Sequence, residues 1–237
     1  MNEKGKLYLI PTRLGDNPPL EVLPLSIKKI IEQLDDYIVE NEKTARRFIK
    51  RVVPNKPQPS LRLKVLNKYT QQSELNSFLD PCENGLSMGI ISEAGCPAIA
   101  DPGSDIVSIA HDKNITVVPL VGPSSILLAL MSSGMNGQSF AFNGYLPIDK
   151  NERKKEIKTL ERRSAELNQT QLFIETPYRN NQMLADLVSV LNPNTRICVA
   201  CDLTLPTEFI KTKPAKDWKN SKEDLHKRPT IFVIQKD

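Results

Sequence analysis

Several signatures of common enzyme classes are missing from this 237-residue sequence. It contains neither G-x-x-x-x-G-K-S/T nor G-x-G-x-x-G, and it has only 10 glycines. These absences argue against a P-loop NTPase and against a standard dinucleotide-binding dehydrogenase. H-E-x-x-H and G-x-S-x-G are also missing, and the chain has 2 histidines. A Ser-His-Asp hydrolase and a zinc protease of the H-E-x-x-H type are therefore disfavoured.

Cysteine is scarce as well, and the 4 cysteines are too few for a disulfide scaffold at this length. Cys198 and Cys201 have the C-x-x-C spacing of a redox or metal pair. They fall in a strand-like run, however, and residues three apart on a strand point to opposite faces. We interpret them as small buried side chains, and we expect no metal site.

No apolar run approaches the roughly 20 residues that are needed to cross a bilayer. The N-terminus leads directly into a short strand pattern, without the features of a targeting segment. We therefore expect a soluble, cytoplasmic protein that has no membrane partner.

Strand-like and helix-like patterns alternate along the first half of the chain. The predicted strands cover residues 7–10, 37–39, 61–66, 88–91 and 115–120. Helical patterns lie between them, and this alternation is typical of a parallel sheet covered by helices.

The second half of the chain has a different pattern. Strand-like runs occur at residues 171–175, 196–203, 208–211 and 230–235. The last two lack a long intervening helix of conventional pattern, so we expect antiparallel pairing there. The sequence predicts an α/β protein of two domains, residues 1–120 with a mainly parallel sheet and residues 121–237 with a mixed one. Their facing strand ends would form a cleft, which is the usual place for a ligand.

A loop rich in glycine and proline follows the predicted strand at residues 88–91. It begins at Ser92-Glu93 and runs to Gly103, and similar loops follow the strands that precede residues 11–16 and 121–125. Glycine and proline permit close approach of the backbone, and ligands of open α/β sheets bind beyond the carboxyl ends of the strands. Such loops are also ordinary strand–helix connections, and it is their recurrence that favours a ligand site.

Basic residues are concentrated in one segment, although the formal net charge is only +4. Residues 43–68 contain nine basic and no acidic side chains: Lys43, Arg46, Arg47, Lys50, Arg51, Lys56, Arg62, Lys64 and Lys68. Such a run is often solvated surface, but its field also suits a polyphosphate such as RNA. Helical spacing places Arg46 near Lys50, and Arg47 near Arg51.

Five motifs in fixed order resemble those of the tetrapyrrole-methylase superfamily. They are GKLYLIPTRLG at residues 5–15, SEAGCPAIADPG at 92–103, VPLVGPSS at 118–125, FNGYLP at 142–147 and ETPYR at 175–179. Within that superfamily they are most similar to the bacterial ribosomal RNA small subunit methyltransferase I family, which methylates the ribose 2′-hydroxyl of a cytidine.

The resemblance implies a class III methyltransferase that binds S-adenosyl-L-methionine in the interdomain cleft and forms a homodimer. Its substrate would be ribosomal RNA or the small ribosomal subunit. The implied cofactor-binding residues are Pro11, Gly15, Glu93, Ala94, Gly95, Pro97, Asp101, Gly103, Gly122, Pro123, Ser124, Ser125, Thr176, Pro177, Thr204, Pro229 and Thr230.

Candidate catalytic residues come from the strand ends. Glu40 and Glu93 each follow a predicted strand directly, so they are candidates for positioning the substrate or removing its hydroxyl proton, with Lys43 as a further candidate. For Glu40 the alternative is a carboxylate that is favoured by the dipole of the next helix. The candidate RNA-binding residues are Arg46, Arg47, Lys50, Arg51 and Arg179.

The chain also departs from the family pattern. Asn41 stands where the family usually has aspartate and Tyr178 where it usually has histidine, and we expect the C-terminal extension of the RNA enzymes to be lacking. Three hypotheses therefore stay open: a methyltransferase of ribosomal RNA, a methylase of a tetrapyrrole or precorrin, and a catalytically silent RNA-binding relative.

Overall fold

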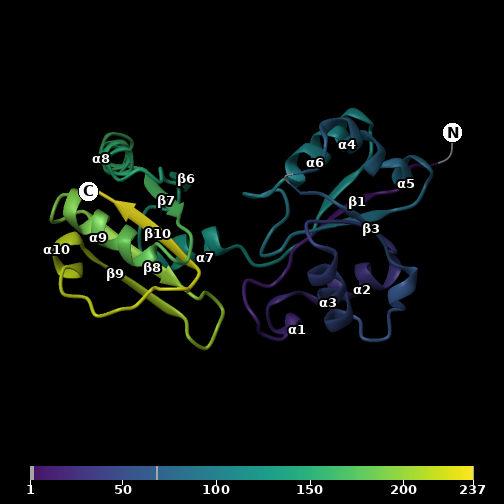
Figure 1. Cartoon of the computed structure of the whole chain (residues 1–237), viewed down its shortest axis with the longest axis horizontal. Helices are drawn as coiled ribbons and strands as arrows, with labels where there is room; N and C mark the ends of the chain where they lie inside the picture. Colours follow the sequence, from purple (N-terminus) through teal and green to yellow (C-terminus); the bar gives the residue numbers. More distant parts are fainter. Residues whose placement is uncertain (1–2, 68, 237) are drawn as a thin grey trace. The chain divides into compact units, whose positions relative to one another are not determined.

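The chain folds as two units, Met1–Ser124 and Ser125–Asp237, each with its own sheet. The computed structural model describes residues 3–67 and 69–236. Both units combine helices with a five-stranded sheet (Figure 1), so the predicted α/β class is confirmed.

The sheet of the first unit is parallel throughout, as predicted. Its strands are β1 (Leu7–Ile10), β2 (Asp36–Val39), β3 (Arg62–Val65), β4 (Met88–Ile91) and β5 (Val117–Pro119), in the order β3-β2-β4-β1-β5. Ile91 of β4 lies opposite both Ile10 of β1 and Val39 of β2. The three strands therefore end level with one another, and the loops that follow them emerge at one edge of the sheet.

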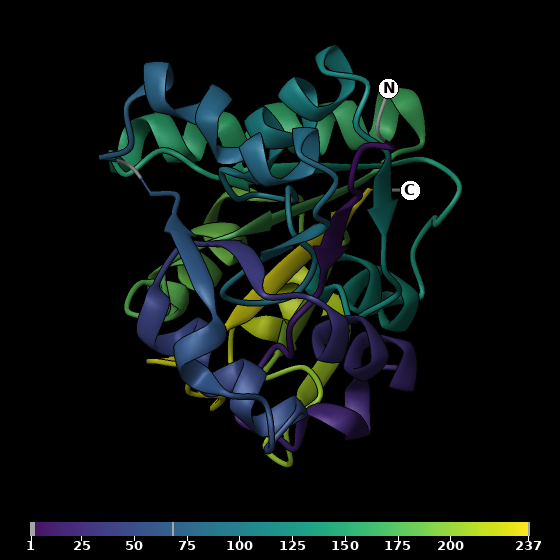
Figure 2. The same ribbon diagram turned by 90° about the vertical axis from the view of Figure 1, so that its right-hand side faces the viewer.

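Helices cover both faces of this sheet (Figures 1 and 2). One face carries α1 (Pro19–Val22), α2 (Leu25–Gln33) and α3 (Glu42–Val52). The other carries α4 (Gln72–Phe78), α5 (Asp80–Glu83) and α6 (Gly103–Asp112). A short 3-10 helix, η1 (Gln58–Ser60), precedes the edge strand β3. The two buried clusters explain why β2 and β4 are apolar on both sides.

Gly89 sets the spacing at the centre of the first sheet. A Cβ at this position would lie 2.6 Å from Ile10 Cδ1 and 3.1 Å from Tyr37 Cδ1. Tyr37 is fully buried, and its hydroxyl donates a hydrogen bond to the Leu34 carbonyl at 2.9 Å. A larger residue at 89 would therefore displace the strands on both sides.

The second unit has a mixed sheet. Its strands are β6 (Phe140–Tyr145), β7 (Thr170–Ile174), β8 (Arg196–Cys201), β9 (Phe209–Pro214) and β10 (Thr230–Gln235), in the order β6-β7-β10-β8-β9. β6 and β7 are parallel, whereas β10 and β9 pair antiparallel with their neighbours, as expected. Since β10 is antiparallel to β7 and β8, its first residues lie beside the carboxyl ends of those two strands.

The helices of the second unit are α7 (Ser125–Ser133), α8 (Lys150–Leu167), α9 (Asn180–Val190) and α10 (Ala215–Trp218). The main core of this unit lies between α8, α9, α10 and one sheet face, and it includes Cys201 but not Cys198. Both cysteines are buried and free, and they point to opposite faces of β8. No helix within residues 3–67 and 69–236 is long and apolar enough to cross a membrane.

Three four-residue helices, α1, α5 and α10, were not predicted from the sequence. A single turn is too short to show helical periodicity in the sequence.

Arg153 and Asp186 form a buried ion pair that joins α8 to α9. The exposed fractions of their side chains are 7% and 4%, and the Arg153 Nη2 to Asp186 Oδ2 distance is 2.7 Å. Arg153 Nη1 also donates to the Ile148 carbonyl at 2.7 Å. The pair satisfies both desolvated charges, so removing one partner would leave the other uncompensated.

We expect Asp186→Asn to lower the free energy of unfolding by about 3 kcal/mol or more, because it leaves the Arg153 charge buried without its counter-ion. Urea denaturation measures this change. Glu166→Gln is the matched control, since the Arg162–Glu166 pair on the same helix is exposed on both sides. It should change the free energy by about 0.5 kcal/mol at most, and equal effects of the two variants would contradict the prediction.

Candidate functional site

The loop after β4 is held in an unusual backbone conformation. Ala98 and Ala100 both have positive φ, at 64° and 59°. Asp101 Oδ1 braces the turn by accepting hydrogen bonds from the backbone N–H groups of Ala98, at 2.7 Å, and Gly103, at 2.8 Å. Positive φ in non-glycine residues costs free energy and is found preferentially at functional sites. The loop is thus fixed by its own contacts before any ligand binds.

Loops after three strands of the first sheet contact one another. The Thr12 N–H donates to the Gly95 carbonyl at 2.9 Å, which ties the loop after β1 to the loop after β4. A Cβ at Gly122 would lie 2.3 Å from Pro11 Cβ, so the loop after β5 packs against the loop after β1 with no room for a side chain. Glycine at 122 is therefore required by this close approach.

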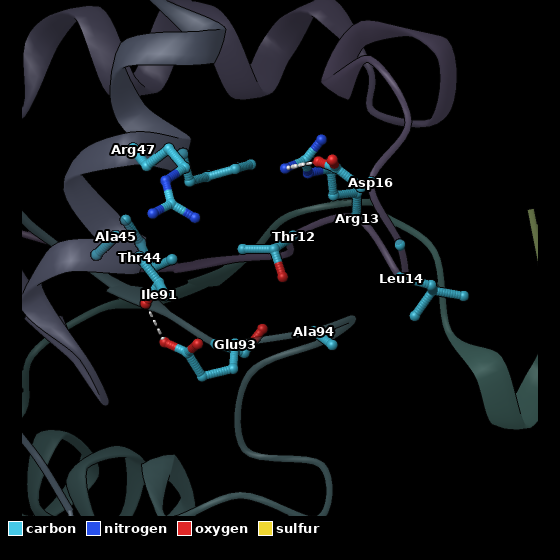
Figure 3. Close-up of a pocket in the computed structure, with 13 residues that line it drawn as sticks. Thr12, Arg13, Leu14, Asp16, Thr44, Ala45, Arg47, Ile91, Glu93 and Ala94 are labelled. Atoms are coloured by element: carbon cyan, nitrogen blue, oxygen red, sulfur yellow. Dashed lines mark hydrogen bonds and ion pairs between the residues drawn. The ribbon is translucent and has the colours of Figure 1, made fainter. Parts of the chain in front are cut away.

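α3 begins directly after β2, and Asn41 caps it. Asn41 Oδ1 accepts hydrogen bonds from the N–H groups of Lys43, at 3.0 Å, and Thr44, at 3.2 Å. The Thr44 hydroxyl in turn donates to Glu93 Oε1 at 2.6 Å. This bond connects the first turn of α3 to the loop after β4, and it fixes the direction of the Glu93 carboxylate (Figure 3).

A cavity of about 210 Å³ lies where these elements meet. It is lined by Thr12, Arg13, Leu14, Gly15, Asp16, Thr44, Ala45, Arg47, Phe48, Ile91, Ser92, Glu93 and Ala94. The Arg47, Thr12 and Glu93 side chains extend from three different elements into the same space (Figure 3). Small-molecule sites usually measure roughly 300–1,000 Å³, so this cavity suits one part of a ligand.

Thr12 carries a buried hydroxyl in this cavity. Its side chain is 4% exposed, and Oγ1 has no hydrogen-bond partner among the residues that the structure describes. Buried hydroxyls are normally hydrogen-bonded, so a polar group of a ligand would supply the hydrogen bond that Thr12 Oγ1 lacks. The cavity thus offers a hydroxyl, a carboxylate and a guanidinium to one bound molecule.

Carboxylates gather at the ends of β2 and β4. Burial raises the pKa of Glu40, and the charges of Asp101 and Glu93 raise that pKa further, while a backbone hydrogen bond from Glu93 opposes them. Burial also raises the pKa of Asp101. Glu40 and Asp101 line a narrow hollow between β2 and the loop after β4, whereas Glu93 lines the larger cavity.

The predicted cofactor-binding residues fall into two sets, one in each unit. Gly15, Glu93 and Ala94 line the cavity of the first unit. Gly103 is the first residue of α6. The other residues of this set lie in the same strand-end loops: Pro11, Gly95, Pro97, Asp101, Gly122, Pro123 and Ser124. Ser125 is the first residue of α7, in the second unit.

The second set lies around the carboxyl ends of β7 and β8. Thr176 and Pro177 follow β7, and Thr204 follows β8 with a positive φ of 73°. The Asp202 N–H donates to the Pro229 carbonyl at 2.9 Å, which brings Pro229 and Thr230 to the same edge. Thr204 Oγ1 is buried and has no partner among the described residues, so it is a second hydroxyl that a ligand would satisfy.

Two of the four predicted RNA-binding side chains on α3 are engaged within the protein. Arg46 pairs with Glu42 and donates to the Gln58 carbonyl at 2.7 Å, and Arg51 pairs with Asp16 at 2.5 Å. Arg47 and Lys50 are exposed, and Arg47 also lines the cavity. Sequence spacing alone does not distinguish basic side chains that bind within the protein from those that are exposed to a partner.

Arg179 and Lys43 are the remaining predicted contacts. Arg179 Nη2 lies 2.5 Å from Oε1 of Glu175, whose side chain is 1% exposed. Lys43 is exposed on the first turn of α3 but does not line the cavity. Thr12, Arg13 and Thr44 do line it. Thr12 and Arg13 belong to the loop at residues 11–16, which the sequence indicated as a ligand loop without singling them out, whereas Thr44 was not predicted. Each is an ordinary polar residue that becomes notable only through burial or through its contacts.

No protein-family model matches the chain, but curated proteins do. It is 28% identical over 231 residues to ribosomal RNA small subunit methyltransferase I of Vibrio cholerae, covering 96% of this chain and 76% of that protein. The identity to the protein of the same name from Escherichia coli O157:H7 is 26% over 237 residues, with 99% and 79% covered. The identity to the protein of the same name from Bacillus subtilis is 29% over 211 residues, covering 89% of this chain and 68% of that protein.

Solved structures share the fold. The methyltransferase CobJ has a TM-score of 0.63 at 15% identity, with 98% of this chain and 94% of that chain covered. A cobalt precorrin-4 methyltransferase has a TM-score of 0.61 at 14% identity, with 97% and 94% covered. The predicted resemblance to tetrapyrrole methylases and to the ribosomal RNA methyltransferases is thus confirmed. Among the described residues, no group of three or more His, Cys, Asp or Glu side chains is placed to hold a metal.

We expect Glu40→Gln to stabilise the protein at neutral pH. The pKa of Glu40 is raised in the folded chain, so the folded state binds more protons than the unfolded state between the two pKa values. Stability then falls as pH rises through that interval. Glutamine removes the free-energy cost of a charged Glu40 in the folded state. The added stability of the variant should disappear below about pH 4, where Glu40 is protonated in both the folded and the unfolded state.

Urea unfolding midpoints measured from acid to neutral pH test this prediction. Glu21→Gln, at an exposed position on α1, controls for the general loss of one negative charge. A Glu40→Gln variant that is less stable than wild type at pH 7 would contradict the prediction.

Proposed function

We propose that this chain is an S-adenosylmethionine-dependent methyltransferase that modifies the 2′-hydroxyl of a ribose in small-subunit ribosomal RNA. The cavity at the ends of β1 and β4 carries the proposal, because it combines an unpartnered hydroxyl, an oriented carboxylate and an exposed guanidinium. The names of the relatives support RNA as the substrate class.

The residues present suit a polar cofactor. The loops at residues 93–103 and 122–124 bring backbone groups close together through Gly95 and Gly122. These loops of the first unit would hold S-adenosylmethionine, which would supply an electrophilic methyl group on a positively charged sulfur. Much of the recognition would come from backbone groups, which explains the lack of a short sequence signature.

Glu93 is the residue best placed to accept the proton of the substrate hydroxyl. It lines the cavity, and the Thr44 hydroxyl holds one of its carboxylate oxygens at 2.6 Å, which leaves the other to face a ligand. The Glu93 carboxylate would accept the hydroxyl proton as the ribose oxygen takes up the methyl group, which the cofactor would supply with a neutral thioether as the leaving group. Thr12 Oγ1 would fix the ribose beside it.

Glu40 has a different role in this proposal. It lines the neighbouring hollow with Asp101 and not the cavity itself. Burial chiefly raises the pKa of Glu40, and the charges of Asp101 and Glu93 raise it further. Glu40 would therefore act on the substrate indirectly, through its charge near Glu93 and through the position of the loop after β4. Lys43, on the exposed first turn of α3, would contact an RNA phosphate.

The size of the cavity and the charge of its rim favour RNA over a tetrapyrrole. A volume of about 210 Å³ accommodates a ribose or a base but not a macrocycle. Arg47 and Lys50 extend a positive surface from the cavity along α3, as the phosphates on either side of a bound nucleotide require. Asn41 gives no support to the hypothesis of a catalytically silent relative, because its amide oxygen caps α3 by accepting hydrogen bonds from two N–H groups of the first turn.

Methyl transfer tests the proposed function. We expect tritiated methyl groups from S-adenosylmethionine to enter small-subunit ribosomal RNA, and not precorrins, when each is offered to the purified protein. Glu93→Gln should lower the rate by about 10²-fold or more, in the range of general base catalysis. Glu74→Gln, on α4 across the sheet, is the control.

The possible results of this experiment separate the hypotheses. Incorporation into precorrin alone would replace RNA as the substrate, and no incorporation with intact RNA binding would indicate a silent relative. A Glu93→Gln rate within about twofold of wild type would remove Glu93 as the proton acceptor.

RNA affinity at several salt concentrations tests the positive surface. We expect the double variant Arg47→Gln/Lys50→Gln to weaken binding and to reduce the slope of log K against log salt by about 1 to 2, because each lost phosphate contact releases fewer counterions. The double variant keeps Arg46 and Arg51, because both side chains already bind other groups within the protein. Lys28→Gln/Lys29→Gln on α2 is the control, and equal slopes in the two double variants would contradict the prediction.

A further inference from the structure

Tyr178 is an exposed aromatic residue between β7 and α9. Its side chain is 69% exposed, so packing in a core does not account for it. His226 meets the ring edge-on, with centroids 5.8 Å apart and an interplanar angle of 73°. Lys227 Nζ lies 5.9 Å from the centroid of the ring. One exposed tyrosine thus has a second aromatic ring and a cation beside it.

Two loops that are distant in sequence hold this cluster together. The Lys227 N–H donates to the Pro177 carbonyl at 2.9 Å. Asn181, at the start of α9, accepts from the Leu225 N–H at 2.8 Å and donates to Asp224 Oδ1 at 2.7 Å. These bonds join the loop that carries His226 and Lys227 to the loop that carries Tyr178.

The backbone on both sides of the cluster is also fixed. Lys227 has a φ of 60°, a conformation that a side-chain-bearing residue keeps only when its surroundings impose it. On the Tyr178 side, Arg179 is anchored to the buried Glu175. The ring therefore has a defined direction and does not simply sweep through solvent.

An exposed aromatic ring beside cationic side chains is the usual surface for an unpaired nucleobase. Every base has a π face, and stacking on an aromatic side chain contributes about 1–3 kcal/mol per base in single-stranded nucleic acid binding. A nearby lysine adds attraction for the phosphates on either side of the base. The aromatic rings of the core contrast with this arrangement: Phe173 and Phe232 stack on each other and are 0% exposed.

We propose that Tyr178, His226 and Lys227 form a stacking platform for an unpaired base of the RNA substrate, outside the cavity that takes the target ribose. The proposal rests on RNA being the substrate of this chain. An open surface fits an unpaired base, whereas small-molecule sites bury 70% or more of their ligand. The exposed Tyr178 ring therefore favours a base over the cofactor as its partner.

Binding of a short unstructured oligocytidine tests the platform, measured by fluorescence anisotropy at fixed salt. We expect Tyr178→Ala to weaken binding about 5- to 100-fold, the range that corresponds to loss of one stacked base. Tyr178→Phe keeps the ring and should bind within about twofold of wild type. Tyr145→Ala removes an equally exposed tyrosine, 62% exposed on β6, and should leave the affinity unchanged.

Calorimetric titration of the same variants with S-adenosylmethionine distinguishes the platform from a cofactor site. Cofactor affinity should be the same in Tyr178→Ala as in wild type. Weaker cofactor binding with unchanged oligonucleotide binding would overturn the proposal, and so would an oligonucleotide affinity that Tyr178→Ala leaves unaltered.

The platform and the methyltransferase proposal can fail separately. Weakened oligonucleotide binding in Tyr178→Ala, together with no methyl transfer to RNA by wild type, would support the platform and overturn the enzymatic proposal. Methyl transfer to RNA by wild type, together with normal oligonucleotide binding by Tyr178→Ala, would support the enzymatic proposal and overturn the platform. Failure of wild type to bind the oligonucleotide would overturn the platform.

Discussion

The close approach of three loops at one edge of the first sheet is the constraint on which the candidate site depends. Ile10 of β1 lies opposite Ile91 of β4, and Leu9 lies opposite Pro119 of β5, so the loops after these three strands share a small space. Gly122 meets Pro11 with no room for a Cβ, and the Thr12 N–H is bound to the Gly95 carbonyl. The cavity, the direction of Glu93 and the unpartnered Thr12 hydroxyl all follow from this packing. The site is thus built mainly from backbone positions, with few side chains that a motif search would find.

The same packing concentrates negative charge at a place where it is poorly solvated. Glu40, Asp101 and Glu93 lie at the ends of β2 and β4, and the pKa values of Glu40 and Asp101 are raised by burial. Buried carboxylates with raised pKa values lower the stability of the folded state when they are charged. Such groups are found preferentially at sites where a reaction uses them. Around this acidic centre, Arg47 and Lys50 provide positive charge at the surface. Glu93, the proposed proton acceptor, is bound to Thr44, which lies about one turn of α3 before Arg47, a proposed phosphate contact.

Sequence patterns predicted the two α/β units and most of the longer strands and helices, because amphipathic periodicity is a local property of the chain. They also indicated the strand-end loops, since glycine and proline mark them directly. They could not show that Arg46 and Arg51 bond within the protein, or that Thr12 and Thr44 face the cavity. Those facts depend on which distant segments meet, such as the Gln58 carbonyl with Arg46. Short helices such as α10 were missed because a single turn shows no helical periodicity.

Asn41 and Tyr178, the two residues at which the sequence differs from the motifs it resembles, have different structural roles. At position 41 the helix needs an oxygen that accepts from the N–H groups of Lys43 and Thr44, and an amide supplies it as well as a carboxylate does. The replacement thus conserves the fold and removes one negative charge beside Glu40. At position 178 no fold requirement is evident, because the ring is 69% exposed. The exposed ring of Tyr178 and its polar hydroxyl are therefore available to a partner molecule. The first change is neutral for the architecture, whereas the second alters the chemistry that the surface presents.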